Sequence, residues 1–319
     1  MAPKLSAEQL GVLREWEPRL IAAVRKSDAR GARAAIEAIQ LAFVNDRSHH
    51  RLLRAKNWYY DCLLAVGKTA DAKVGLQAVQ QRAKEGTRLF AECASQLAIC
   101  CIRLRLYEEA KRHLRTVIEN INAITSPARR QQFQKRVIER LGEEVLLSQL
   151  LDRDEGEMDP KTIHEQAVKM TREKTLDEIY DEVGKFVPSG TPLLIKNVQE
   201  HALTLMPASD RQLLEAPKGT MPKSVAGKKV MNALQRILWK SLCDDDSVIC
   251  GLWKKKVPSF FGEGYLTLAI VTTMKEWRIG LPSLAAAGGA VMMSKSCEVF
   301  CETCKPAGLM IPRTDKPEG

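Results

Sequence analysis

The sequence is poor in aromatic residues, glycine and proline, and each shortage excludes a class of protein. Aromatic residues make up 5 % of the 319 residues, which is few for an all-β protein because strands favour aromatic and β-branched side chains. The 19 glycines and 14 prolines are too few for a low-complexity or collagen-like chain. Hydrophobic residues at 45 % and charged residues at 28 % exclude a chain disordered throughout and a multi-span membrane protein.

Charge and length set two further limits. The 49 Lys and Arg residues outnumber the 39 Asp and Glu residues, for a net charge of +10. This balance permits attraction to nucleic acid or to anionic lipid, and a solvated basic surface explains it equally well. At roughly 150 residues per domain, the length suggests about two domains.

The first residues predict no export signal. Glu8, Arg14, Glu15 and Glu17 stand where a secretory signal would have its apolar core. The chain has nine cysteines, and an odd number without an export signal predicts reduced thiols and no disulfide framework. We therefore expect a cytoplasmic protein.

The first half of the chain has the pattern of helical hairpins. Ala, Leu, Arg, Glu and Gln, which are strong helix formers, dominate from Ser6 to about Leu151. Apolar residues recur three and four positions apart, which places them on one face of a helix. Two such stripes flank a short break at 105–107, as expected of an antiparallel helix pair: Leu97, Cys100, Cys101 and Leu104, then Ala110, Leu114, Val117 and Ile118.

The segment around this break resembles a tetratricopeptide repeat. The positions that carry the resemblance are Leu97, Ala98, Tyr107, Ala110, Leu114 and Val117. It departs from that pattern at Cys101, where an aromatic residue is usual, at Arg105, where glycine is usual, and at Asn122, where the closing proline is usual.

Two further copies can be laid over the sequence. One includes Tyr59, Tyr60 and its turn glycine Gly67, although Gly67 and Arg105 lie further apart than the usual repeat of about 34 residues. A weaker copy runs from Leu13 to Ala42, and a helix from Gln131 to Leu151 would cap the stack. Degenerate helical repeats of other families fit nearly as well.

The resemblance implies an interaction domain over residues 1–151. Stacked hairpins bury a continuous core and leave an elongated groove, which in tetratricopeptide proteins usually holds a peptide or a helix of a partner. Arginines in that groove would favour an acidic partner segment. The same arginines would instead lie on a solvated face if they pair with Glu108, Glu109 and Glu119. The candidate groove residues are Tyr60, Arg103, Arg105, Arg112 and Arg115.

Beyond residue 151 the sequence changes character. The stretch 151–161 contains acidic residues, Gly156 and Pro160, so we place a boundary there. Residues 152–226 are expected to form a helical linker region with loops rich in proline and glycine, including one helix from Ile163 to Val187. Residues 227–319 form the third predicted part.

A basic amphipathic helix is predicted over 227–242. Such a helix can lie on an anionic membrane surface or in the groove of a partner, and it can equally pack on its own domain. The residues expected to make the outside contact are Lys228, Lys229, Arg236, Trp239 and Lys240.

An apolar helical hairpin is predicted at about 260–296. Its two apolar stretches, 265–274 and 279–294, are each shorter than the roughly 20 residues that a membrane-spanning helix needs. A buried core hairpin accounts for them. A membrane-inserting hairpin, held latent by the repeat domain, is the alternative, and the protein would then associate with a membrane on activation.

Cys297, Cys301 and Cys304 form the sharpest local cluster. Their C-x3-C-x2-C spacing resembles the iron–sulfur signature of radical S-adenosylmethionine enzymes, although the strand–helix alternation of that family is missing here. A zinc site would need a fourth ligand, and no histidine follows His201. Buried apolar thiols are the simplest interpretation, and we predict neither a cofactor nor a metal.

Catalysis has little support in the sequence. The five histidines stand in helix-like surroundings, with no glycine elbow around a serine: His49, His50, His113, His164 and His201. We therefore expect an all-α protein, not an enzyme, that acts as an adaptor or regulatory subunit and binds a partner protein through its repeat groove. The alternatives are the latent membrane effector and a nucleic-acid-binding protein that uses its Arg-rich helices.

Overall fold

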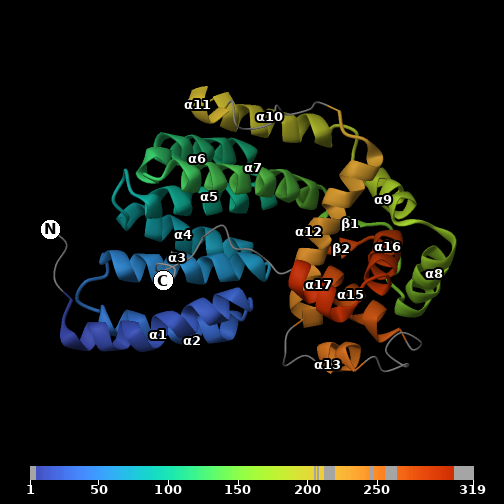
Figure 1. Ribbon diagram of the computed structural model, residues 1–319, viewed down its shortest axis with the longest axis horizontal. Coiled ribbons are helices and arrows are strands. Elements are labelled where there is room, and N and C mark those ends of the chain that lie inside the picture. Colours follow the sequence, from blue (N-terminus) through green and yellow to red (C-terminus); the bar gives the residue numbers. More distant parts are fainter. Residues whose placement is uncertain are drawn as a thin grey trace. The chain divides into compact units, whose positions relative to one another are not determined.

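The computed structural model describes residues 5–204, 206, 208–211, 220–243, 248–255 and 264–304. Within these residues the regular secondary structure is helical apart from two strands of two residues each, which confirms the all-α class (Figure 1). The described residues divide into two compact units, the first made of 5–141 and 198–211 and the second of 142–197 and 220–304. This division is one of spatial contact; the three-part division at 151 and 226 stays a prediction.

The first unit contains three helical hairpins in succession. In each, a first helix packs against the second, and each second helix contacts the first helix of the next hairpin. In addition α1 contacts α3 and α3 contacts α5, so the first helices form one continuous layer. The hairpins are α1 (Ala7–Arg25) with α2 (Ala29–Ala42), α3 (His50–Ala65) with α4 (Thr69–Arg82), and α5 (Arg88–Arg103) with α6 (Tyr107–Glu119).

All three hairpins turn in the same way. The first helix ends two residues before a position with positive φ, and the amide that follows this position donates to the carbonyl five residues back, as in a Schellman motif. These bonds measure 2.9, 2.9 and 2.8 Å. The left-handed residues are Ser27, Gly67 and Arg105, with φ of 54°, 83° and 59°. Membership of the tetratricopeptide class stays a prediction.

Because the three turns share this conformation, we expect two substitutions to change the free energy of unfolding in opposite directions. Gly67→Ala places a Cβ in the left-handed region and is expected to lower the free energy of unfolding by about 1 kcal/mol. Arg105→Gly removes the same strain and is expected to raise it by up to about 1 kcal/mol. Thermal unfolding measures both. Gly11→Ala, in the open interior of α1, is the control and is expected to stabilise; a Gly67→Ala protein as stable as wild type would contradict the turn assignment.

Two later segments follow α6 in the first unit. The chain runs through a short 3-10 helix, η1 (Ile121–Ala123), into α7 (Pro127–Leu150), which begins earlier than the predicted capping helix. The second half of α10 (Thr191–Thr204) and Met206, ahead of α11 (Ala208–Arg211), pack against Ile118 and Ile138. A small apolar pocket lies where α6, α7 and Met206 meet.

The second unit is organised around α12. This helix contacts α9, α13, α15, α16 and α17, while α16 also packs on α8. The single helix predicted over 163–187 is two helices, because Thr175 caps the second of them in a capping box with Glu178. Strands β1 (Arg153–Asp154) and β2 (Ile279–Gly280) pair in parallel. The helices are α8 (Pro160–Glu173), α9 (Leu176–Lys185), α12 (Lys223–Cys243), α13 (Val248–Lys254), α15 (Tyr265–Glu276), α16 (Pro282–Met293) and α17 (Cys297–Thr303).

The predicted apolar hairpin corresponds to α15 and α16, which contact each other within the second unit. Every residue of α16 from Leu284 to Met292 is buried, so the hairpin forms part of the core of this unit. Residues 260–263 of the predicted hairpin lie outside the described residues. No helix within the described ranges has the length and apolar character needed to cross a membrane.

Candidate functional site

A polar layer runs across the first helices of the three hairpins. In α1 and α3, Glu17 is buried and accepts from Arg51, whose Nε lies 2.9 Å from Oε1 of the carboxylate, and Arg54 lies 3.8 Å away. In α5, Arg88 donates to Glu92 at 2.6 Å. Opposite charges of the first-helix layer therefore pair with one another inside the stack.

Helix α5 is closed to solvent in this structure. All of its residues from Ala91 to Arg103 are buried, including the polar Glu92, Ser95 and Gln96. Both side-chain polar atoms of Gln96 are buried without a hydrogen-bond partner. The first-helix layer at α5 therefore does not offer a free surface for a partner.

Asp61 of α3 is an acid of this layer whose pKa is shifted. Burial raises the pKa of the Asp61 carboxyl to about 6, while the positive charges of Arg140 and Arg103 act in the opposite direction. Glu92 adds a like charge that raises the pKa further. Asp61 of α3 thus lies under the electrostatic influence of charged side chains on α5 and α7.

The structure separates the predicted groove residues into two groups. Tyr60 packs inside the hairpin α3–α4, where a Cβ on Gly75 would lie 2.0 Å from its ring. Arg103 is 5 % exposed and donates to the carbonyl of Leu64 at 2.5 Å, so it ties the end of α3 to α5. These two side chains are parts of the packed stack.

The other three predicted groove residues remain accessible. Arg105 lies in the exposed turn before α6, and Arg112 and Arg115 are exposed on α6 itself. We call these three residues the α6 arginines. All three belong to the hairpin α5–α6, in its turn or on its second helix.

The predicted contact residues of the basic helix lie on α12, which is largely buried. Trp239 is 6 % exposed and its indole N–H donates to the carbonyl of Cys301 at 2.8 Å. Arg236 binds Glu143 and Glu144, the latter at 2.9 Å. Lys228 is exposed and Lys229 half-buried, and the side chain of Lys240 lies outside the described residues. Two of the five predicted contact residues are therefore engaged within the second unit.

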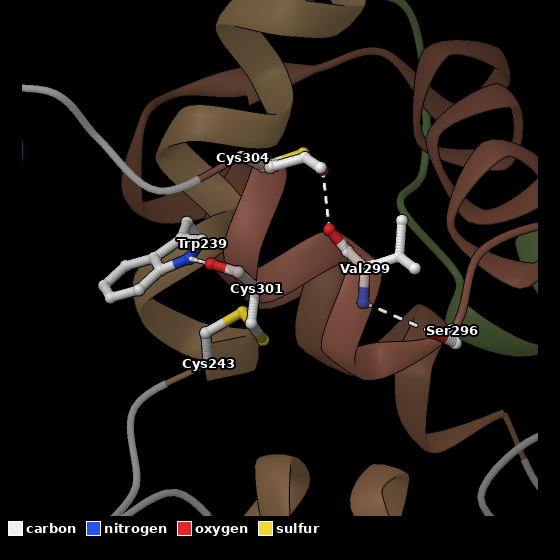
Figure 2. The surroundings of a disulfide bond; sticks show 7 residues. Trp239, Cys243, Ser296, Val299, Cys301 and Cys304 are labelled. Atoms are coloured by element: carbon white, nitrogen blue, oxygen red, sulfur yellow. Dashed lines mark hydrogen bonds between the residues drawn. A yellow bond between two sulfur atoms is a disulfide. The ribbon is translucent and has the colours of Figure 1, made fainter.

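The cysteine cluster corrects the expectation of reduced thiols throughout. Figure 2 shows a disulfide between Cys243 of α12 and Cys301 of α17. The two cysteines are 58 residues apart, and no sequence spacing indicates that they meet. Cys304, at the end of α17, donates to Gln235 at 3.2 Å, and the side chain of Cys297 lies outside the described residues. While Cys301 is bonded to Cys243, the three cysteines cannot act together as thiolate ligands.

One group of residues with the right chemistry to bind a metal was not found from the sequence. Cys101 of α5 lies with Glu109 and His113 of α6, and the donor atoms of all three fall within 4.8 Å of one another. Burial raises the pKa of the Cys101 thiol to about 11 and lowers the pKa of His113. Glu109 and His113 are four residues apart on one helix, a spacing that the sequence does show, but only the fold brings Cys101 beside them.

These observations define the class of the protein: an all-α chain with a stack of three helical hairpins in one unit and a helical second unit with an apolar core hairpin. Its particular family does not follow from comparison, since no family model, curated protein or solved structure matches the chain.

Proposed function

We propose that the chain is a non-enzymatic adaptor or regulatory subunit, and that an acidic segment of a partner protein binds the α6 arginines, Arg105, Arg112 and Arg115. The observation that carries the proposal is the exposure of these three cations on one hairpin of the stack. Guanidinium groups suit this role because they bind carboxylates through paired hydrogen bonds.

The stacked hairpins support this function in a second way. Their first helices form a continuous layer, and both α3 and α4 pack against α5, so we expect the hairpin α5–α6 to move little. A rigid surface loses little conformational entropy when a partner binds. Because α5 is buried from Ala91 to Arg103 in this structure, we place the acidic segment against α6.

Charge reversal tests the proposal directly. We expect Arg105→Glu, Arg112→Glu and Arg115→Glu together to weaken binding of a fluorescent oligoglutamate peptide by about tenfold or more, since each exposed pair contributes up to about 1 kcal/mol. Fluorescence anisotropy measures the affinity, and circular dichroism verifies that the helical content is unchanged.

A matched triple variant serves as the control. Arg14→Glu, Arg25→Glu and Arg30→Glu make the same change in charge at exposed positions of the first hairpin. They are expected to leave most of the affinity intact. Equal losses in the two triple variants would show attraction to net charge alone. Tighter binding of single-stranded DNA than of the peptide, with a steep salt dependence, would favour the nucleic-acid alternative instead.

A further inference from the structure

Three donor groups of different chemistry converge where α5 meets α6. Cys101 is buried, whereas Glu109 and His113 are half-buried, so a small ion can reach the group from the side of α6. Glu109 and His113 are one helical turn apart, which directs both side chains to the same face. The Cys101 thiol already donates to Oε2 of Glu109 at 3.7 Å.

These distances suit a tetrahedral ion. With metal–sulfur bonds of about 2.3 Å and metal–oxygen or metal–nitrogen bonds of about 2.0–2.1 Å, neighbouring ligands of a tetrahedral zinc ion lie about 3.3–3.6 Å apart. The sulfur–oxygen distance of 3.7 Å is close to this value. The His113 nitrogen lies within 4.8 Å of both partners, so a side-chain adjustment of about 1 Å completes the triangle of ligands.

The donor set selects the class of ion. One thiolate, one imidazole and one carboxylate match the ligands that zinc prefers, whereas magnesium and calcium take oxygen ligands only. Three protein ligands leave a fourth position for water. Among the described residues this is the one group of at least three such side chains whose donor atoms meet.

Lys73 competes for the same carboxylate. Its ammonium group lies 2.7 Å from Oε2 of Glu109, and Arg112 adds a second nearby positive charge. A bound dication must displace Lys73 from that oxygen. The affinity of the site for a dication therefore depends on this competition, which a substitution of Lys73 would remove.

We propose that Cys101, Glu109 and His113 bind a zinc-class divalent ion, with Lys73 as the competing cation. The site belongs to the hairpin α5–α6. Its assignment does not rest on the partner binding proposed above, although Arg112 lies near both sites. A bound ion would link side chains of α5 and α6, which the hairpin turn already connects through the backbone.

Cobalt substitution tests this site. The full chain, freed of metal by a chelator, is titrated with Co²⁺ and then with Zn²⁺. We expect one equivalent of Co²⁺ to produce a thiolate-to-cobalt charge-transfer band and visible bands of a tetrahedral ion, both removed by Zn²⁺. Cys101→Ser is expected to abolish the charge-transfer band, His113→Ala to weaken binding by at least about tenfold, and Lys73→Gln to tighten it severalfold.

The neighbouring cysteine provides the matched control. Cys100 is as buried as Cys101 but is not one of the three converging groups, so Cys100→Ser is expected to keep the band. A band that survives Cys101→Ser, or no band in the wild-type chain, would overturn the proposal. If Cys101→Ser does not fold, Glu109→Gln and His113→Ala decide, and wild-type affinity in both would equally reject it.

Discussion

Replacing Arg236 by alanine is expected to destabilise the second unit by about 3–5 kcal/mol, the usual cost of removing one partner of a buried ion pair. The Arg236 side chain is 12 % exposed and binds two acids at once, Glu143 and Glu144. Glu144 is fully buried, so the alanine variant leaves its charge in a low-dielectric interior without this counter-charge. Hydrogen exchange of α12, followed by mass spectrometry, measures the loss in this unit alone.

Two further variants separate charge from packing. Lys228→Ala, at an exposed position of the same helix, is expected to change stability by no more than about 0.5 kcal/mol. The combined replacement of Arg236 by Met, Glu143 by Gln and Glu144 by Leu removes the charges together, and we expect it to recover most of the lost stability. A triple variant as unstable as Arg236→Ala would mean that side-chain packing, and not the unpaired charge, causes the loss.

Among substitutions that add a single methyl group to the second unit, Gly227→Ala is expected to lower the free energy of unfolding the most. A Cβ on Gly227 would lie 1.8 Å from the carbonyl oxygen of Tyr180, and one on Gly184 would lie 2.1 Å from the carbonyl oxygen of Lys223. These glycines let α9 and α12 approach with backbone against backbone. Because backbone atoms cannot rotate aside, we expect the two helices to separate and the free energy of unfolding to fall by about 3 kcal/mol or more.

Gly251→Ala is the matched control for this prediction. It makes the same chemical change in α13 of the same unit, where no atom lies within 4 Å of the new Cβ. We expect it to be neutral or to stabilise by up to about 1 kcal/mol, since alanine favours a helix over glycine. Urea unfolding compares the two proteins. Similar stabilities would show that α9 and α12 do not depend on the close approach at Gly227.

The helices and the first-half hairpins could be predicted from local sequence because they depend on local spacing. Apolar residues three and four apart, such as Leu97 with Cys100 and Cys101, mark the buried face of α5 whatever surrounds it. The break at 105–107 marks the turn, where Arg105 adopts the left-handed conformation that glycine favours. The helical fold class therefore follows from the spacing of apolar residues along short segments of the sequence.

What covers each helix was decided only by the tertiary structure. Periodicity identifies one apolar face, but it does not show that Arg103 is buried too, or that α12 lies inside its unit. Likewise, the disulfide joins cysteines on two helices that spacing cannot pair, and Cys101 meets His113 only because α5 and α6 pack together. The period of an α-helix fixes the face of the helix on which each side chain lies. The neighbours of that side chain depend on contacts between segments that are far apart in the sequence.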